Sequence, residues 1–90
     1  MINKINDCSL KGVKLIELNK FNDFRGSYQE TYNYNEYIKN DINVDFVQDD
    51  LSISNYNVLR GLHGDKNTWK LVSCLEGEFF LVVVNYDKNN

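Results

Sequence analysis

The chain has 90 residues, a net charge of −3 and no run of lysines or arginines. This length suits one domain or part of one, and the acidic balance argues against a protein that binds nucleic acid or a membrane surface. No apolar stretch reaches the roughly 20 residues that span a bilayer, and the N-terminus lacks the apolar core of a signal peptide, so we expect a cytoplasmic protein.

The expected elements of the first two thirds of the chain are strands with one helical turn. Val13–Leu18 partly alternates apolar and polar residues, which predicts a strand. Asn33–Lys39 is short and rich in tyrosine, and we expect it to form a helical turn at the surface. Strand-forming residues then gather in Phe46–Ser54 and Val58–His63, which predict two more strands.

The last expected strands are Trp69–Leu75 and Glu78–Tyr86. Glu76-Gly77 lies between them, and its glycine can adopt the positive φ of a tight turn, so these strands are predicted to form a hairpin. The pattern of about five short strands predicts an all-β fold.

Phe79–Val84 is apolar at every position, which is typical of a strand covered on both faces. Left uncovered, such a strand would pair or aggregate. The cover comes either from a partner chain or from the rest of a larger domain, and we favour the larger domain, of which residues 1–90 would be one part without a linker.

The cysteines and acidic residues do not suggest a metal site. Cys8 and Cys74 share no metal-ligand spacing, so we expect two reduced thiols, with Cys74 buried. A single histidine cannot build a site that needs several, and the nearby carboxylates have no spacing typical of an oxygen cage. We therefore predict no metal and no cofactor.

The stretch Arg60-Gly61-Leu62-His63 carries the clearest chemical signal. Histidine can exchange a proton near neutral pH, and arginine holds anionic oxygens in a planar fork. Strand alternation would place Arg60 and His63 on opposite faces unless the backbone twists at Gly61. The pair suggests acid/base chemistry on an anionic substrate.

Four ordered blocks resemble the dTDP-4-dehydrorhamnose 3,5-epimerase family, over the chain from about Gly12 onward. The blocks are Asp23–Glu30, Phe46–Ser54, Leu59–His63 and Trp69–Val72. The resemblance corresponds to the first half of such a domain and implies the front part of a cupin-type jelly roll. It also implies a homodimer with exchanged N-terminal strands.

The resemblance implies a nucleotide-sugar epimerase acting at C3, C5 or both, beside the C4 ketone of a 4-keto-6-deoxy sugar nucleotide. In the family such enzymes serve bacterial surface polysaccharide synthesis, of capsule or lipopolysaccharide. They remove the proton with a base and stabilise the enolate oxygen with a cation, without a metal.

Individual residues match family positions. His63 matches the base, and Lys70 matches the lysine that faces the enolate oxygen. Arg25 and Arg60 match the arginines that hold the diphosphate. Three further residues match positions lining the nucleotide-sugar site: Glu30, Gln48 and Asp50.

The family's tyrosine acid, and the aspartate that orients its histidine, belong to the half that these blocks do not reach. Tyr86 lies in a different block and does not take the acid's role. Gly64–Val72 resembles instead the subgroup acting on GDP-linked 4-keto-6-deoxy heptoses, and Asp50 stands where an asparagine is usual. The nucleotide and the sugar therefore stay open.

Each residue also has a purely structural interpretation. His63 could be a structural residue in a strand, and Lys70 could protect an edge strand. Arg25 and Arg60 could be surface cations paired with Asp23 or Asp50. Trp69 is expected in the core, whereas Tyr28 fits either the core or a stacking surface. The alternative functions are a binding module without turnover, or an inactive truncated remnant.

Overall fold

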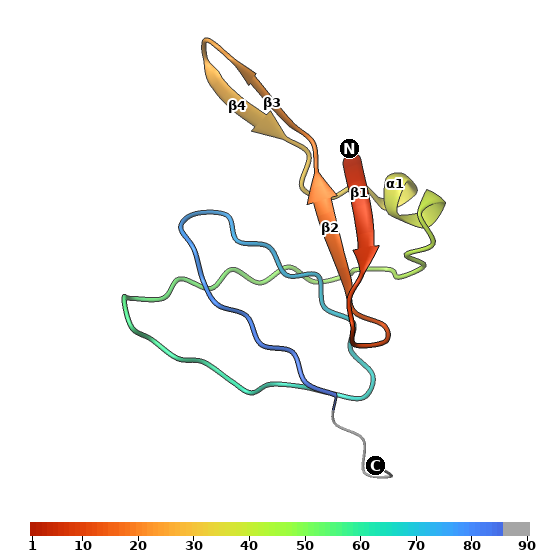
Figure 1. Cartoon of the computed structure of the whole chain (residues 1–90), viewed down its shortest axis with the longest axis vertical. Coiled ribbons are helices and arrows are strands. Elements are labelled where there is room, and N and C mark those ends of the chain that lie inside the picture. The colour runs from red at the N-terminus through yellow and green to blue at the C-terminus, as the bar shows by residue number, and fades with distance from the viewer. Residues whose placement is uncertain (86–90) are drawn as a thin grey trace.

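The computed structural model describes residues 1–85 (Figure 1). It contains strands β1 (Ile2–Asp7), β2 (Lys14–Leu18), β3 (Lys20–Asp23) and β4 (Gly26–Gln29), followed by helix α1 (Tyr34–Lys39). β1 pairs with β2 and β3 pairs with β4, both antiparallel. This β-rich architecture confirms the expected all-β class, with one short helix.

The first sheet is a hairpin made by β1 and β2. Asp7 pairs with Lys14 at the closed end, and the Lys14 ammonium lies 2.8 Å from the Asp7 carboxylate. The Cys8 amide donates to the Val13 carbonyl at 2.9 Å, which closes the connecting loop. The strand expected at Val13–Leu18 is thus confirmed as β2, whereas β1 was not predicted.

The second sheet is the hairpin of β3 and β4, joined by the two residues Phe24 and Arg25. Asp23 Oδ1 accepts a hydrogen bond from the Arg25 amide at 2.9 Å, and Gly26 follows with φ of +132°, a conformation that favours glycine. Every residue of β3 and β4 is exposed. Figure 1 shows this hairpin pointing away from the rest of the chain.

Helix α1 confirms the helical turn expected at Asn33–Lys39. Asn33 caps it, because the Asn33 side-chain oxygen accepts from the Glu36 amide at 3.1 Å. Tyr37 is 3% exposed and is the one buried hydrophobic side chain found within residues 1–85. Its ring meets Tyr32 edge-on at 4.9 Å, and Tyr32 meets Phe46 at 5.6 Å.

The expectation that this turn lies only at the surface is therefore wrong. A six-residue helix is too short to be stable alone, and α1 is held by the aromatic contacts of Tyr37. Edge-to-face contacts of this kind contribute beyond the burial of their area. The helix supplies the centre of the small core beside β1 and β2.

Replacing Asn33 with alanine is expected to lower the free energy of unfolding of this N-terminal region by about 1 kcal/mol, because the Glu36 amide loses its cap. Hydrogen exchange of the α1 amides measures the loss. Asn35→Ala is the matched control, since Asn35 lies inside the helix and alanine favours helix there. Equal protection in the two variants would contradict the capping role.

Residues 43–85 differ most from expectation. They form no hydrogen-bonded strand. The strands predicted at Phe46–Ser54, Val58–His63 and Trp69–Leu75 are therefore wrong. The strand predicted at Glu78–Tyr86 is wrong for residues 78–85, which the structure describes. Tyr86 lies outside the described residues. The one backbone hydrogen bond found within residues 43–85 joins the Val58 amide to the Asn55 carbonyl at 3.3 Å. Residues with a high strand propensity form β-sheet hydrogen bonds only when a neighbouring strand lies beside them.

The turn expected at Glu76-Gly77 is partly supported. Gly77 has φ of +81°, as a tight turn there requires, and Figure 1 shows the chain reversing at this point. No ladder joins the two flanking segments within the described residues, so the predicted hairpin lacks its hydrogen bonds.

Two burial predictions are also wrong. Cys74 is exposed, and Trp69 is 66% exposed rather than in the core. Both side chains lie within residues 43–85, where no other described segment packs over them and shields them from solvent. Cys8 and Cys74 are both free and exposed thiols. Within the described chain, no helix is both long enough and apolar enough to cross a membrane.

Candidate functional site

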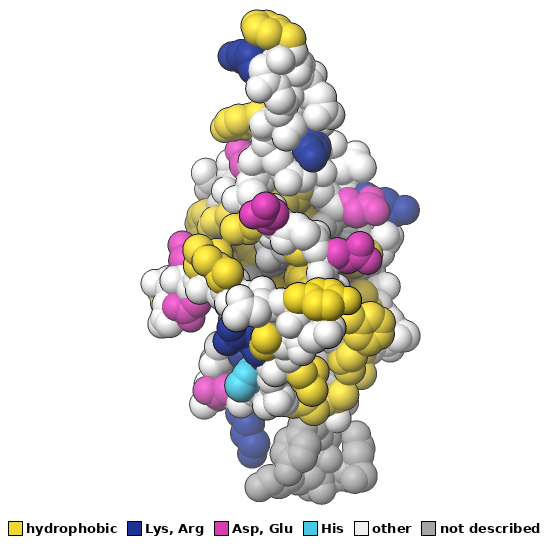
Figure 2. Space-filling view, turned by 90° about the vertical axis from the view of Figure 1, so that its left-hand side faces the viewer, with side chains coloured by type: hydrophobic (Ala, Val, Ile, Leu, Met, Phe, Trp, Pro, Cys, Tyr) yellow, Lys and Arg dark blue, Asp and Glu magenta, His cyan; other side chains and the backbone are white. Residues whose placement is uncertain are grey.

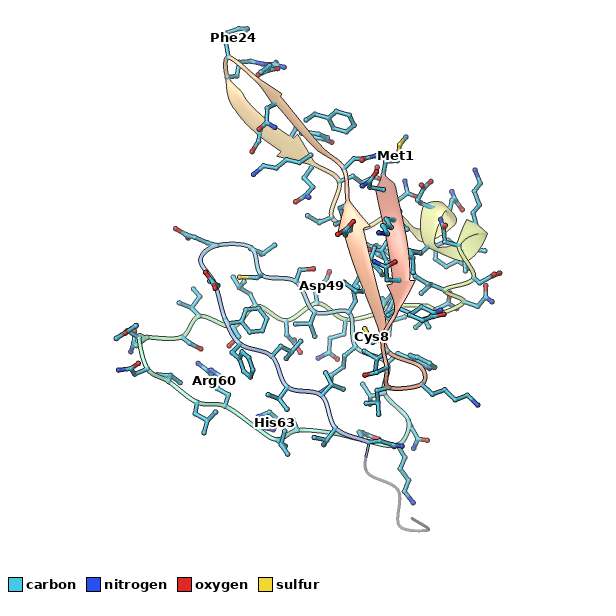
Figure 3. All side chains as sticks on the ribbon, in the orientation of Figure 1. Met1, Cys8, Phe24, Asp49, Arg60 and His63 are labelled. Atoms are coloured by element: carbon cyan, nitrogen blue, oxygen red, sulfur yellow. The ribbon has the colours of Figure 1, made fainter. Side chains whose placement is uncertain are left out.

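The seven residues singled out in the sequence fall into two groups in space. Arg25 and Glu30 belong to the β3–β4 hairpin and its end, while the others lie between residues 46 and 70. Figure 3 shows Phe24 at the hairpin tip, at the opposite end of the chain from Arg60 and His63. One copy of the described chain thus does not bring Arg25, which follows Phe24, to His63.

Arg60 and His63 share one exposed stretch, and Gly61 between them has φ of +112°. The backbone therefore departs from strand alternation where the sequence indicated that it could. Figure 3 shows Arg60 and His63 close together along this stretch. Figure 2 shows the single histidine, in cyan, at the molecular surface.

The Arg60 guanidinium fastens this stretch to the preceding segment. Its Nε donates to Ser54 Oγ at 2.8 Å, and one of its terminal nitrogens donates to the Ile53 carbonyl at 3.1 Å. The structure records no pairing of Arg60 with Asp50 among the described residues. Two donors are thus engaged, and a guanidinium has five, so Arg60 retains donors for an anion.

Gln48 and Asp50 form a pair of their own. The Gln48 amide nitrogen donates to both carboxylate oxygens of Asp50, at 3.1 and 3.2 Å. Both side chains are exposed. The pair presents the Gln48 amide oxygen and the Asp50 carboxylate as acceptors, so it suits hydroxyl or N–H groups of a ligand better than phosphate.

Lys70 lies near Asp65. The pKa of the Asp65 carboxyl is lowered, first by the hydrogen bond from the Asn67 amide at 2.8 Å, then by the Thr68 side chain, with a further contribution from the charge of Lys70. An ionised Asp65 keeps a negative charge in the neighbourhood of the lysine. Sequence reasoning did not assign Asp65 this place.

Arg25 is held by its own turn. One of its terminal nitrogens lies 2.6 Å from Asp23 Oδ2, and its Nε donates to both oxygens of that carboxylate. The hydrogen bonds from Arg25 lower the pKa of Asp23, and the pairing raises that of Arg25. The Asp23 pairing anticipated as the structural interpretation of Arg25 is confirmed, and it fixes the guanidinium at the hairpin tip beside Phe24.

Glu30 is occupied by the chain's own N-terminus. The Met1 ammonium donates to Glu30 Oε1 at 3.0 Å, and the Asn33 side chain donates to Glu30 Oε2 at 3.4 Å. These contacts, the ammonium first, lower the pKa of the Glu30 carboxyl. Within one chain, Glu30 therefore ties β1 to the start of α1.

Acid should weaken this tie. Because the folded pKa of Glu30 lies below its ordinary value of 4.5, the pair contributes stability above that pH, and the contribution is lost as the pH falls through the folded pKa. We expect unfolding curves of the wild type and Glu30→Gln to converge in acid and to differ slightly at neutral pH, since the group is exposed. A constant difference across this pH range would contradict the pairing.

Two shallow hollows border other parts of the chain. One runs along the β3–β4 hairpin and includes Arg25, and the other lies between β2 and residues 72–75. His63 and Lys70 line neither. Among residues 1–85, no three histidine, cysteine or acidic side chains gather as a metal-binding group.

Comparisons with known proteins point to one family. Residues 7–90 match the family described as dTDP-4-dehydrorhamnose 3,5-epimerase. A protein of that name from Methanothermobacter thermautotrophicus is 43% identical over 84 residues, which cover 91% of this chain and 45% of the relative. Its namesake from Salmonella typhimurium is 41% identical over 88 residues, covering 91% of this chain and 47% of the relative.

A third protein of the same name, from Escherichia coli, is 38% identical over 86 residues, covering 90% of this chain and 46% of the relative. The chain thus spans about half the length of the curated relatives that it matches. No solved structure matches it significantly. The matched region contains all seven candidate residues.

Proposed function

This chain belongs to the dTDP-4-dehydrorhamnose 3,5-epimerase family, and from that premise we propose that it carries the proton-abstracting part of a nucleotide-sugar epimerase. The substrate is a 4-keto-6-deoxy sugar nucleotide, and the reaction inverts C3, C5 or both. One observation carries the proposal: the Arg60 guanidinium fastens the stretch that bears His63 to the segment that bears Gln48 and Asp50.

The chemistry follows from the position of the ketone. C3 and C5 both flank C4, so removal of either proton leaves a negative charge on O4, and return of a proton on the opposite face inverts the carbon. His63 takes the proton as general base. Lys70 stabilises the charge on O4, where its attraction is greater in the transition state than in the ground state.

The remaining residues bind the substrate. Arg60 keeps donors free for the diphosphate, a geometry that a guanidinium matches well. Gln48 and Asp50 present acceptors, so they face hydroxyl or base N–H groups rather than the phosphates. This acceptor pair is also compatible with a GDP-linked heptose as substrate, because guanine has N–H donors that can bind these acceptors.

Arg25 and Glu30 act across a homodimer with exchanged N-terminal strands. The β3–β4 hairpin projects from its own chain, is exposed along its length, and carries Arg25 at its tip. A projecting hairpin of this kind can reach a second copy, where Arg25 would contact the diphosphate of the partner's substrate. Glu30 would join that site if the Met1 ammonium released it.

The biological setting that we propose is bacterial surface polysaccharide synthesis in the cytoplasm. The jelly roll would be completed by strands beyond those described, which also supply the acid and the carboxylate that orients the base. Neither group can be assigned within residues 1–85, where His63 makes no hydrogen bond.

A binding module without turnover is the second candidate. It is favoured by the lack of a hydrogen-bonded orienting partner for His63 among the described residues. Such a module would keep the anion-binding arginines and would release the nucleotide sugar unchanged, because anchoring of the diphosphate does not require the acid.

Solvent exchange separates the two candidates. Incubated in D2O with a 4-keto-6-deoxy sugar nucleotide, the epimerase is expected to replace the hydrogen at C3, C5 or both with deuterium, which proton NMR of the recovered sugar detects. Calorimetric binding of the nucleotide sugar without any exchange would establish the module instead. Absence of both binding and exchange would contradict the epimerase and the binding module alike.

A further inference from the structure

The Arg60 guanidinium is held along one edge by two consecutive residues of the preceding segment. Its Nε donates to Ser54 Oγ at 2.8 Å, and its Nη2 donates to the Ile53 carbonyl at 3.1 Å. These two nitrogens share one edge of the planar group, and the two terminal nitrogens share another. Within residues 1–85, Nη1 donates no hydrogen bond. One edge of Arg60 is thus fixed, and the other is available to two oxygens of an anion.

The groups that hold Arg60 carry no charge. Arg25 donates from its Nε and Nη2 to the Asp23 carboxylate, so an ion pair compensates the charge of Arg25. Arg60 is bound instead by a hydroxyl and a peptide carbonyl, and no carboxylate pairs with it in the described part of the chain. Arg60 therefore keeps its positive charge uncompensated while its orientation is fixed, and this combination favours binding of a diphosphate.

A tight turn brings the Ser54 hydroxyl to Arg60. The Val58 amide donates to the Asn55 carbonyl at 3.3 Å, and Asn57 has φ of +64°, a conformation that asparagine tolerates better than most residues. The chain therefore reverses between Ser54 and Arg60. Since this is the one backbone hydrogen bond found within residues 43–85, the side-chain bonds of Arg60 are the main link across the turn.

We propose that Ser54 is a positioning residue, whose hydroxyl holds the Arg60 guanidinium in the orientation that binds the diphosphate of the substrate. The identity of this anion rests on the proposed function, and Ser54 itself makes no contact with the substrate. Because Ser54 accepts from Nε, the rotamer of a long side chain is set before the ligand binds. A side chain of this kind that must be ordered on binding lowers the affinity about 3- to 10-fold.

The test measures the dissociation constants of dTDP and GDP by calorimetry, because both carry the diphosphate. For the nucleotide that the wild type binds, Ser54→Ala is expected to raise the dissociation constant about 3- to 10-fold. KM for the sugar nucleotide should rise in the deuterium-exchange reaction while kcat changes little, a split that a general loss of structure would not produce. Ser54→Thr keeps the hydroxyl and should bind the nucleotide as the wild type does.

Ser52→Ala is the matched control, since Ser52 is an exposed serine of the same segment, and the acceptors of Arg60 are Ser54 and Ile53. It should leave the dissociation constant unchanged. In an Arg60→Ala background, Ser54→Ala should cause no further loss, because the two residues act through one contact. Unfolding curves followed by circular dichroism report whether each variant keeps its fold.

Equal dissociation constants for the wild type and Ser54→Ala would overturn the role of Ser54 and leave the epimerase proposal standing. Equal weakening by Ser52→Ala, or a further loss in the Arg60→Ala background, would overturn it as well. A wild type that binds neither nucleotide would remove the anion-binding role of Arg60 and with it this inference. Binding that depends on Ser54, without any exchange in D2O, would support the inference and contradict the epimerase alone.

Discussion

Alanine in place of His63 is expected to lower the rate of deuterium exchange into a 4-keto sugar nucleotide by about 10²- to 10⁴-fold, the contribution typical of a general base. His63 is the single histidine of the chain, so no other imidazole can take its place. The side chain is exposed and makes no hydrogen bond within residues 1–85, so its removal should disturb the fold little.

The measurement is the initial rate of exchange in D2O, followed by proton NMR of the nucleotide sugar. Calorimetry with the nucleotide sugar is the control, and binding should persist in His63→Ala because the arginines remain. Exchange as fast as that of the parent would assign the base to another residue. Loss of both binding and exchange would indicate a structural role for His63.

The second large effect concerns Lys70. Lys70→Met is expected to lower kcat for exchange by about 10²- to 10³-fold, as for the loss of one group that stabilises a developing oxyanion. KM should change little, because the interaction is made mainly in the transition state. Methionine keeps the length of the side chain, so the substitution removes the charge and little volume.

Lys66→Met is the matched control for Lys70, since Lys66 is an exposed lysine of the same loop. It should leave kcat unchanged. Lys70→Arg should recover part of the rate, because it restores the positive charge. A higher KM with unchanged kcat in Lys70→Met would instead place Lys70 among the groups that bind the substrate.

The local part of the fold could be predicted where the signal is short-ranged. Asn33 caps α1 and the turn at Gly77 adopts positive φ, because a cap or a turn depends on a few neighbouring residues. β1, β3 and β4 were missed since they are short and largely polar, without clear alternation. The pairing of β3 with β4 depends on their short connecting loop, in which Gly26 follows Phe24 and Arg25.

The strands predicted beyond residue 43 could not be verified from local sequence alone, because their formation depends on long-range contacts. Phe79–Val84 has the composition of a buried strand, yet ladders and burial depend on neighbours that the described residues do not provide. The same reason explains why Trp69 and Cys74 are exposed. Sequence composition indicates that a segment is able to form a buried strand. Whether it forms one depends on the neighbouring strands and side chains that pack against it.

The roles of the seven candidate residues stay predictions. Sequence similarity identified the residues, but it could not show that Arg60 binds Ser54 and Ile53, or that Glu30 holds the Met1 ammonium. These contacts join residues several to many positions apart and leave no local pattern. The separation of Arg25 from His63 likewise follows from the direction of the hairpin, which no motif encodes.

We expect His63 to remove a proton beside the ketone of the sugar, and deuterium incorporation reports this step directly. The wild-type protein is incubated in D2O with a 4-keto-6-deoxy sugar nucleotide, and the deuterium content of the recovered sugar is measured. We expect deuterium at C3, C5 or both with the wild type, and incorporation slowed about 10²- to 10⁴-fold with His63→Ala. A sugar that the wild type binds and returns unlabelled would rule out His63 as the base of an epimerase.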